Sequence, residues 1–240
     1  MEIQDGFIVG IYNYCDRWCE TCAFTSRCRA FADHAELEAK ADPHLSPVVN
    51  APLLPQDLPP PLPLWARELI EEMNRIASEP VSKEELEQFR PRLMPAHEHI
   101  EDRARTYCRV VGAWLQPRRG DSARDPDDPL SVIGWFQHSI PAKIHRALMG
   151  FAMDEPGERD WPADHDGSAK VALLGMERSH AAWLTLVDTG FATAPEVEPF
   201  IADLVWLSDE LERGFPNARG FVRPGLDEPD EVARLLAAGS

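Results

Sequence analysis

Apolar residues recur every three or four positions through most of the chain after residue 65, which is the spacing of an amphipathic helix. No stretch in that part alternates apolar and polar residues in the way a half-buried strand does. Helical runs are predicted at 66–78, 82–90, 96–116, 129–151, 168–190 and 195–215. The pattern therefore predicts an all-α fold, with the longer runs forming a helical bundle of four to five helices.

Local signals mark where these helices begin, bend and end. Thr193 and Glu196 have the spacing of a capping box ahead of the last helix, and Gly190 suits the left-handed position that follows a helix. Pro141 stands inside an earlier run, where a kink is expected. The run 168–190 is apolar nearly all round, so the other helices are expected to wrap it.

Two polar stretches are expected at the surface. One is the acidic loop 152–167, in which Asp164, His165 and Asp166 predict a helix-capping turn, because they lack the spaced oxygen ligands of an EF-hand. The other is the tail after residue 216.

The chain before the bundle divides into two parts of different composition. Residues 1–42 hold four of the five cysteines and a short helical run. Residues 43–65 carry eight prolines, which exclude a helix or an inner strand, so a proline-rich linker or arm docked along an apolar surface is expected. The predicted organisation is thus a cysteine-rich metal-binding segment (1–42), the arm (43–65) and a helical bundle with a C-terminal tail (66–240).

The amino-acid composition limits the classes of partner that are expected for this chain. The formal net charge is −17, and phosphate recognition needs clustered Lys and Arg, so a nucleic-acid partner is not expected. No stretch approaches the roughly 20 apolar residues that span a bilayer, which argues against a membrane. The acidic N-terminus with its short apolar run does not resemble a signal peptide. A cytoplasmic setting follows, where thiols stay reduced and clustered cysteines favour metal over disulfides.

The clustered cysteines carry the clearest chemistry in the sequence. Cys15, Cys19, Cys22 and Cys28 have the spacing C-x3-C-x2-C-x5-C. Four thiolates complete the tetrahedral shell that Zn²⁺ prefers, and the same four could hold a 4Fe-4S cluster. Zinc is favoured, the cluster is the alternative, and free or redox-active thiols are a third interpretation.

The first three cysteines also resemble the C-x3-C-x2-C motif of radical-SAM enzymes. That resemblance covers eight residues, Thr21 stands where an aromatic residue usually precedes the last cysteine, and the βα repeats of that barrel are missing. We therefore reject it.

A broader resemblance links three stretches of the chain: CDRWCETCAFTSRC, QHSIPAKIHRAL and DGSAKVALLGMERSHAAW. Together they resemble uncharacterised bacterial helical proteins with an N-terminal CDRWCxxC-type cysteine motif. The resemblance implies the same architecture, a cysteine run followed by helices, and it implies no activity.

A second metal site inside the bundle is a weaker hypothesis. Glu177 and His180 form Glu-x-x-His, the spacing of di-iron bundles, and His97 with Glu101 could present two more ligands. No second Glu-x-x-His appears, so a solvated or salt-bridged arrangement of these residues is favoured.

One helix is the best place for an anionic small molecule. Lys143 and Arg146 lie on it, with His138 and His145 along one flank, although an exposed polar face is the simpler interpretation. Cys108 lies beside a core stripe and is expected to be a small buried apolar residue.

The sequence thus predicts a metal-binding helical protein whose four-cysteine centre has a structural role. We expect it to act as a binding or interaction protein, with a protein or small molecule as partner. The alternative is a metalloenzyme or electron-transfer protein that uses an iron–sulfur cluster or a carboxylate–histidine site. Whether the chain is an enzyme is left open.

Overall fold

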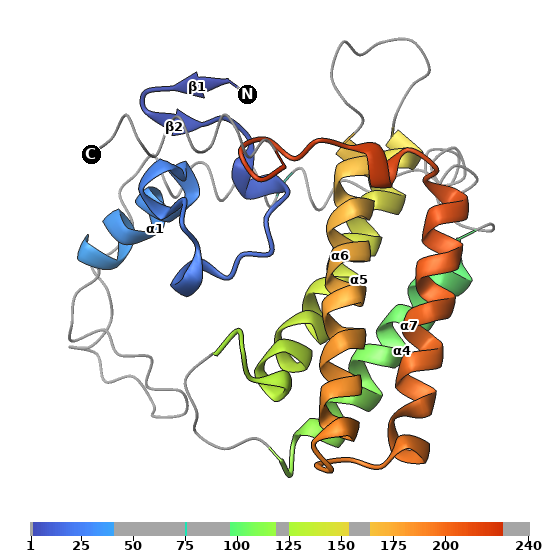
Figure 1. Ribbon diagram of the computed structural model, residues 1–240. Helices are drawn as coiled ribbons and strands as arrows, with labels where there is room; N and C mark the ends of the chain where they lie inside the picture. The colour runs from blue at the N-terminus through green and yellow to red at the C-terminus, as the bar shows by residue number, and fades with distance from the viewer. Residues whose placement is uncertain (1, 41–74, 76–96, 119–124, 154–163, 228–240) are drawn as a thin grey trace. The chain divides into compact units, whose positions relative to one another are not determined.

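The computed structural model describes residues 2–40, 75, 97–118, 125–153 and 164–227. The predicted arm at 43–65 and the predicted helices at 66–78 and 82–90 lie outside this part, apart from residue 75. The described chain is mostly helical, which confirms the predicted all-α fold class (Figure 1).

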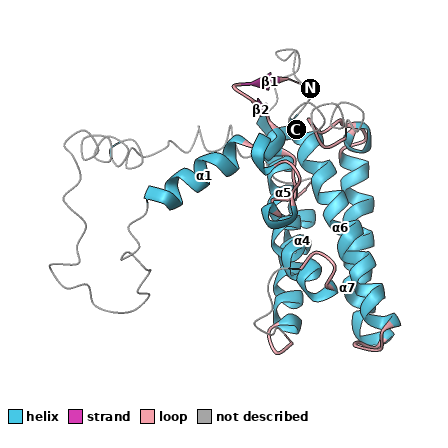
Figure 2. Ribbon diagram, turned by 60° about the vertical axis from the view of Figure 1, so that its left-hand side comes forward, coloured by secondary structure: helices cyan, strands magenta, loops and turns pink. Residues whose placement is uncertain are grey.

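Four long helices make the bundle: α4 (Glu98–Leu115), α5 (Pro129–Met153), α6 (Asp164–Asp188) and α7 (Ala194–Gly214). Figures 1 and 2 show them side by side. Each packs against two others, with α5 next to α4 and α6, and α7 next to α6 and α4. Their periodic apolar faces meet in one core, as a bundle requires.

The core is centred on α6. Buried positions of this helix occur on nearly every side, from Ala169 and Leu173 to Trp183. The Trp183 ring stacks on Phe200 of α7 and meets Trp114 of α4 edge-on, each with ring centroids 4.8 Å apart. Helix α6 packs against α5 and α7, and Trp183 reaches α4 across the core. It is therefore one of four helices around a shared core and is not enclosed by the other three, contrary to the expectation.

The predicted signals at the α6–α7 turn are confirmed. Gly190 has φ +72°, its N–H donates to the Val187 carbonyl, and the N–H of Phe191 donates to Leu186, which together make a Schellman motif. The capping box of Thr193 and Glu196 then opens α7.

Two boundary predictions are wrong. The acidic stretch at Asp164–Asp166 is the first turn of α6 and not a capping loop before it, and Asp166 and Gly167 are buried. Acidic side chains suit this end of a helix, because the exposed N–H groups there carry partial positive charge. Helix α5 continues through Pro141 to Met153, two residues beyond the predicted end.

The N-terminal residues begin with a hairpin that the sequence analysis missed. Strands β1 (Ile3–Gln4) and β2 (Phe7–Ile8) pair antiparallel across Asp5-Gly6. Both turn residues have positive φ, 51° and 84°, as a two-residue hairpin turn with Asp-Gly demands. Three 3₁₀ turns and helix α1 (Arg29–Lys40) follow.

Residues 1–34 and 92–240 form one compact unit, and residues 35–91 form another. Within the first unit, Trp18 is 2% exposed and belongs to the same buried cluster as the bundle core. The cysteine segment, which we define as residues 12–31, is therefore packed against the bundle.

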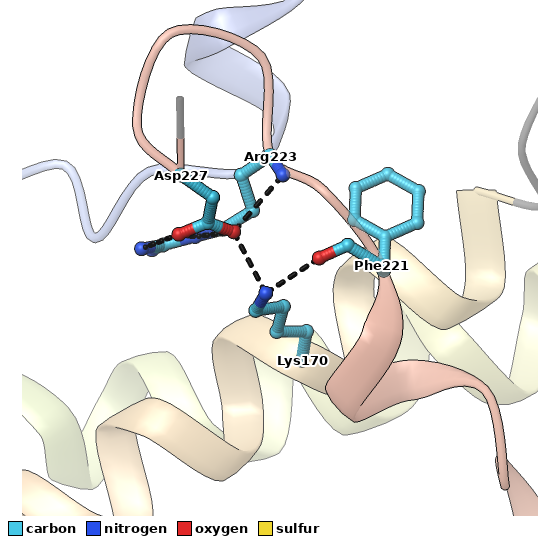
Figure 3. Close-up of polar contacts among 4 residues, drawn as sticks. All are labelled: Lys170, Phe221, Arg223 and Asp227. Atoms are coloured by element: carbon cyan, nitrogen blue, oxygen red, sulfur yellow. Dashed lines mark hydrogen bonds and ion pairs between the residues drawn. The ribbon is translucent and has the colours of Figure 1, made fainter. Parts of the chain in front are cut away.

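The tail after residue 216 is not all surface, contrary to expectation. Residues 215–227, here called the C-terminal strap, bury Phe215, Ala218 and Phe221. Lys170 of α6 donates to the Phe221 carbonyl and pairs with Asp227 at 2.7 Å, as Figure 3 shows. The strap also packs on the N-terminal residues, because the Tyr14 and Phe221 rings lie 4.8 Å apart.

Candidate metal and ligand site

The four clustered cysteines lie on the loops and 3₁₀ turns before α1. Cys19 opens one 3₁₀ turn, Cys22 ends it, and Cys28 ends the next. All are partly buried and none forms a disulfide. Together with Cys15 they line one small cavity of about 20 Å³, here called the cysteine cavity.

Backbone amides point at two of these sulfurs. The Phe24 N–H donates to Cys22 Sγ over 3.4 Å, and the Arg17 N–H donates to the Cys15 thiol. Each amide lies two residues after its cysteine. Hydrogen bonds of this kind stabilise the thiolate, which is the form that binds a metal.

Burial favours the neutral thiol and raises the pKa of two of these cysteines. Burial raises the pKa of Cys15, and the Arg17 N–H and the nearby Lys143 ammonium lower it only in part. Burial also raises the pKa of Cys19, and the other three cysteines add to that effect by charge repulsion. A bound cation would relieve this repulsion.

As the side chains stand, no three His, Cys, Asp or Glu residues within the described ranges form a group that could hold a metal ion. The cysteines nevertheless line one cavity, and the position of each sulfur depends on a single side-chain torsion with three staggered wells. The donor set therefore suits Zn²⁺ or an iron–sulfur cluster by the identity of its four ligands, all of which line one cavity, and binding would require the thiols to draw together.

Asp16 fixes the cysteine segment to the bundle. Its carboxylate accepts the Trp18 N–H at 3.1 Å and pairs with Arg178 of α6 at 2.7 Å. Its carbonyl accepts the Trp135 indole N–H of α5 at 2.8 Å. The Trp18 and Trp135 rings stack 5.5 Å apart, so the polar anchors surround an apolar contact.

Tyr14 and Asn13 add two further polar anchors. The Tyr14 hydroxyl donates to Asp164 of α6, whose carboxylate also accepts from Arg146 of α5. Burial raises the pKa of Tyr14 to about 12, and its bond to Asp164 contributes to the rise. Lys143 of α5 donates to the Asn13 carbonyl at 2.7 Å.

A cavity of about 620 Å³, here called the large cavity, lies between the cysteine segment and α5. Arg17, Arg118 and Lys143 supply its cationic groups, and Trp135 with Leu130 supplies apolar surface. Its other lining residues are Cys15, Asp16, Asp128, Ser131, Gly134, His138, Ser139 and Ala142.

Part of this lining was predicted from the sequence. Lys143 and His138 were named as candidates, whereas Arg17, Trp135 and Ser131 were not. A signal was present, since the α5 members of the lining recur every three or four residues and so share one helix face. What covers that face could not be inferred, because the covering residues Cys15 to Arg17 are more than 100 residues away in the sequence.

The residues of the second predicted metal site have other partners. Glu101, which is 6% exposed, pairs with His145 of α5 and with Arg105. The His97 ring lies edge-on to Phe151, with centroids 6.2 Å apart.

On α6, Glu177 is half exposed and pairs with Arg219 of the strap, while His180 is partly buried. Glu101 and Glu177 thus each face a basic partner. Cys108, expected to be buried, is partly exposed, and its sulfur lies 3.4 Å from His138 Nδ1.

None of the described helices is long and apolar enough to cross a membrane. Comparison of the chain with protein-family models, with curated proteins and with solved structures finds no match for it.

Proposed function

We propose that Cys15, Cys19, Cys22 and Cys28 bind one metal centre, with Zn²⁺ favoured, and that this centre holds the cysteine segment in place. The observation that carries the proposal is that all four thiols, free of disulfides, line one small cavity. In the cytoplasm, where we place the protein, thiols stay reduced and available to a metal.

A structural role fits the surroundings of the cysteines. Among its described residues the N-terminal part buries only three large apolar side chains, Ile8, Ile11 and Trp18. Short loops with so little apolar burial are commonly ordered by a metal, whose binding free energy contributes directly to folding. Once ordered, the segment forms one wall of the large cavity, so the protein acts as a metal-stabilised binding protein.

An iron–sulfur cluster on the same cysteines is the second candidate. The hydrogen bonds from backbone N–H groups to Cys15 and Cys22 suit a cluster as well as they suit zinc. Hydrogen bonds to sulfur also tune the reduction potential of iron–sulfur clusters. Its function would be electron transfer or redox catalysis. The carboxylate–histidine alternative has no such observation, since Glu101 and Glu177 pair with basic residues.

Elemental analysis of the full chain, purified without oxygen, tests the proposal. We expect colourless protein with one zinc ion per chain. Cys19→Ser and Cys28→Ser should each lose most of the metal, because three thiolates bind zinc more weakly than four. Cys108→Ser is the matched control and should retain it, since Cys108 does not line the cysteine cavity.

Unchanged metal content in both Cys19→Ser and Cys28→Ser would overturn the four-cysteine site. Iron with acid-labile sulfide and a brown colour would replace zinc by the cluster. Metal retained after all four cysteines are substituted would instead support a carboxylate–histidine site.

A further inference from the structure

We propose that the large cavity binds a small organic anion, a carboxylate or a phosphate monoester that carries a ring or a short apolar chain. Lys143 and Arg17 would contact the anionic group, and Trp135 with Leu130 would contact the apolar part. This inference goes beyond the proposed metal centre and does not depend on which metal is bound.

The volume and lining of the cavity suit such a ligand. Pockets for small molecules typically enclose about 300–1,000 Å³, and this one encloses about 620 Å³. Such pockets combine apolar surface with a few placed polar groups. Here an indole ring, a leucine and an alanine stand beside two serines and three cationic side chains.

The two carboxylates in the lining are already occupied. Asp16 pairs with Arg178, and Asp128 accepts the Leu130 and Ser131 amides at the start of α5. Within the described residues, neither carboxylate forms an ion pair with Lys143 or Arg17. Arg118 is likewise occupied, because it pairs with Glu196 at 2.8 Å.

Two cationic groups remain for a ligand. Within the described residues, Lys143 makes one hydrogen bond, to a neutral carbonyl, and no salt bridge. Lys143 is partly buried, and burial lowers its pKa to about 8. The Arg17 guanidinium likewise has no hydrogen bond or ion pair with any residue that the structure describes. In a protein of net charge −17, two cations that form no ion pair within the described residues and lie at one cavity favour an anionic occupant.

The backbone at Arg17 supports a functional role for this residue. Its φ is +58°, a left-handed conformation that glycine or asparagine adopts more readily than arginine. The conformation persists because the Arg17 N–H donates to Cys15 while both neighbours, Asp16 and Trp18, are anchored on the bundle. Non-glycine residues held in this way concentrate at ligand sites.

The indole of Trp135 is held in a fixed orientation beside these cations. Its N–H is engaged by the Asp16 carbonyl, and its ring stacks on Trp18. A rigid aromatic side chain costs little conformational entropy when a ligand packs on it. The site thus pairs a fixed apolar wall with two cations, which is the arrangement that an aryl or short-chain anion requires.

Titration of the full metal-containing chain with benzoate and with phenyl phosphate tests the proposal. Heat release and the change in tryptophan fluorescence are measured together, with benzyl alcohol as the neutral comparator. We expect at least one anion to bind with a Kd of about 1 mM or below and benzyl alcohol to bind at least about tenfold more weakly. Raising the salt concentration should weaken binding of the anion.

Variants locate the site. Lys143→Met and Arg17→Ala should each weaken binding of the anion about tenfold, whereas Arg109→Ala, an exposed arginine of α4 outside the cavity, should leave it unchanged. Arg17 is itself exposed, so Arg17→Ala remains informative if Lys143→Met folds poorly.

Three results would overturn the proposal: no heat or fluorescence change with either anion at about 10 mM, equal binding of benzyl alcohol, or full binding in the folded Arg17→Ala variant. None of them bears on the metal content, so the metal centre and the anion site stand or fall separately.

Discussion

The bundle and the cysteine segment belong to one compact unit but are held by different forces. Each helix of the bundle buries several apolar side chains at helical spacing, among them Leu204, Leu207 and Leu211 of α7. The cysteine segment contributes mainly Trp18 to the shared core and is otherwise attached through Asn13, Tyr14 and Asp16.

The difference affects how each region tolerates change. Apolar burial is non-directional and spread over many residues, so a bundle tolerates the loss of any single exposed contact. Hydrogen bonds and ion pairs require particular atoms at particular distances, so the cysteine segment depends on a few side chains. The four predictions below test this contrast, from the largest expected effect on stability to the smallest.

Trp183→Ala should have the largest effect. Trp183 is fully buried and touches rings from two other helices, so its removal should lower the free energy of unfolding by about 3–5 kcal/mol. Chemical denaturation measures the loss. Leu184→Ala is the neighbouring control and should cost under about 1 kcal/mol, because Leu184 is 47% exposed. Equal costs for the two variants would contradict a core centred on α6.

Trp18→Ala tests whether the two regions unfold together. Because Trp18 is 2% exposed and stacks against Trp135 of the bundle, we expect the variant with its metal bound to lose about 3 kcal/mol in the free energy of unfolding and to unfold in a single cooperative transition. Ile3→Ala, at a 41% exposed position, is the control. A variant whose helices unfold at the wild-type denaturant concentration, while protease cleaves the cysteine segment, would show that the regions are independent.

Asp227→Asn should weaken the attachment of the C-terminal strap and lower the free energy of unfolding by about 1–3 kcal/mol at pH 7. Burial raises the pKa of Asp227, but hydrogen bonds from Arg223 and Lys170 outweigh it, and the net pKa lies well below the ordinary value. A carboxyl group with a lowered folded-state pKa stabilises the protein above its unfolded pKa of about 3.9, and that stability is lost as the pH falls further.

The difference between wild type and Asp227→Asn should therefore shrink as the pH drops from 5 towards about 2. Denaturation at a series of pH values measures it. Asp209→Asn, on an exposed position of α7, should show no such convergence. A gap that stays constant across this range would rule out the proposed role of the Asp227 charge.

Metal removal should change the helical signal least. Chelation is expected to disorder the cysteine segment and to leave most of the helical circular dichroism in place, because α4 to α7 bury their own apolar faces. The fluorescence of Trp18 and Trp135 should change at the same time, since the two rings stack where the segment meets α5. Cooperative loss of all helical signal would mean that the bundle needs the segment to fold.

Most of the bundle was predictable because its signals are local. The spacing of apolar residues located α4, α5, α6 and α7, and the capping box and Gly190 located the α6–α7 turn. The start of α6 was misplaced because acidic residues suit both a loop and the first turn of a helix. The β1–β2 hairpin was missed, although Asp5-Gly6 is a strong turn signal.

By itself, the sequence determined the helical class, the extensive apolar surface of α6 and the four cysteines as a candidate metal site, because periodicity and close spacing are properties of neighbouring residues. Only the tertiary structure decided that Asp16 meets Arg178, that Asp227 meets Lys170 and that Arg17 faces the same cavity as Lys143. These pairs lie far apart in the chain, and a charged residue at a given position has many possible partners. Only the packing of the helices selects one of them.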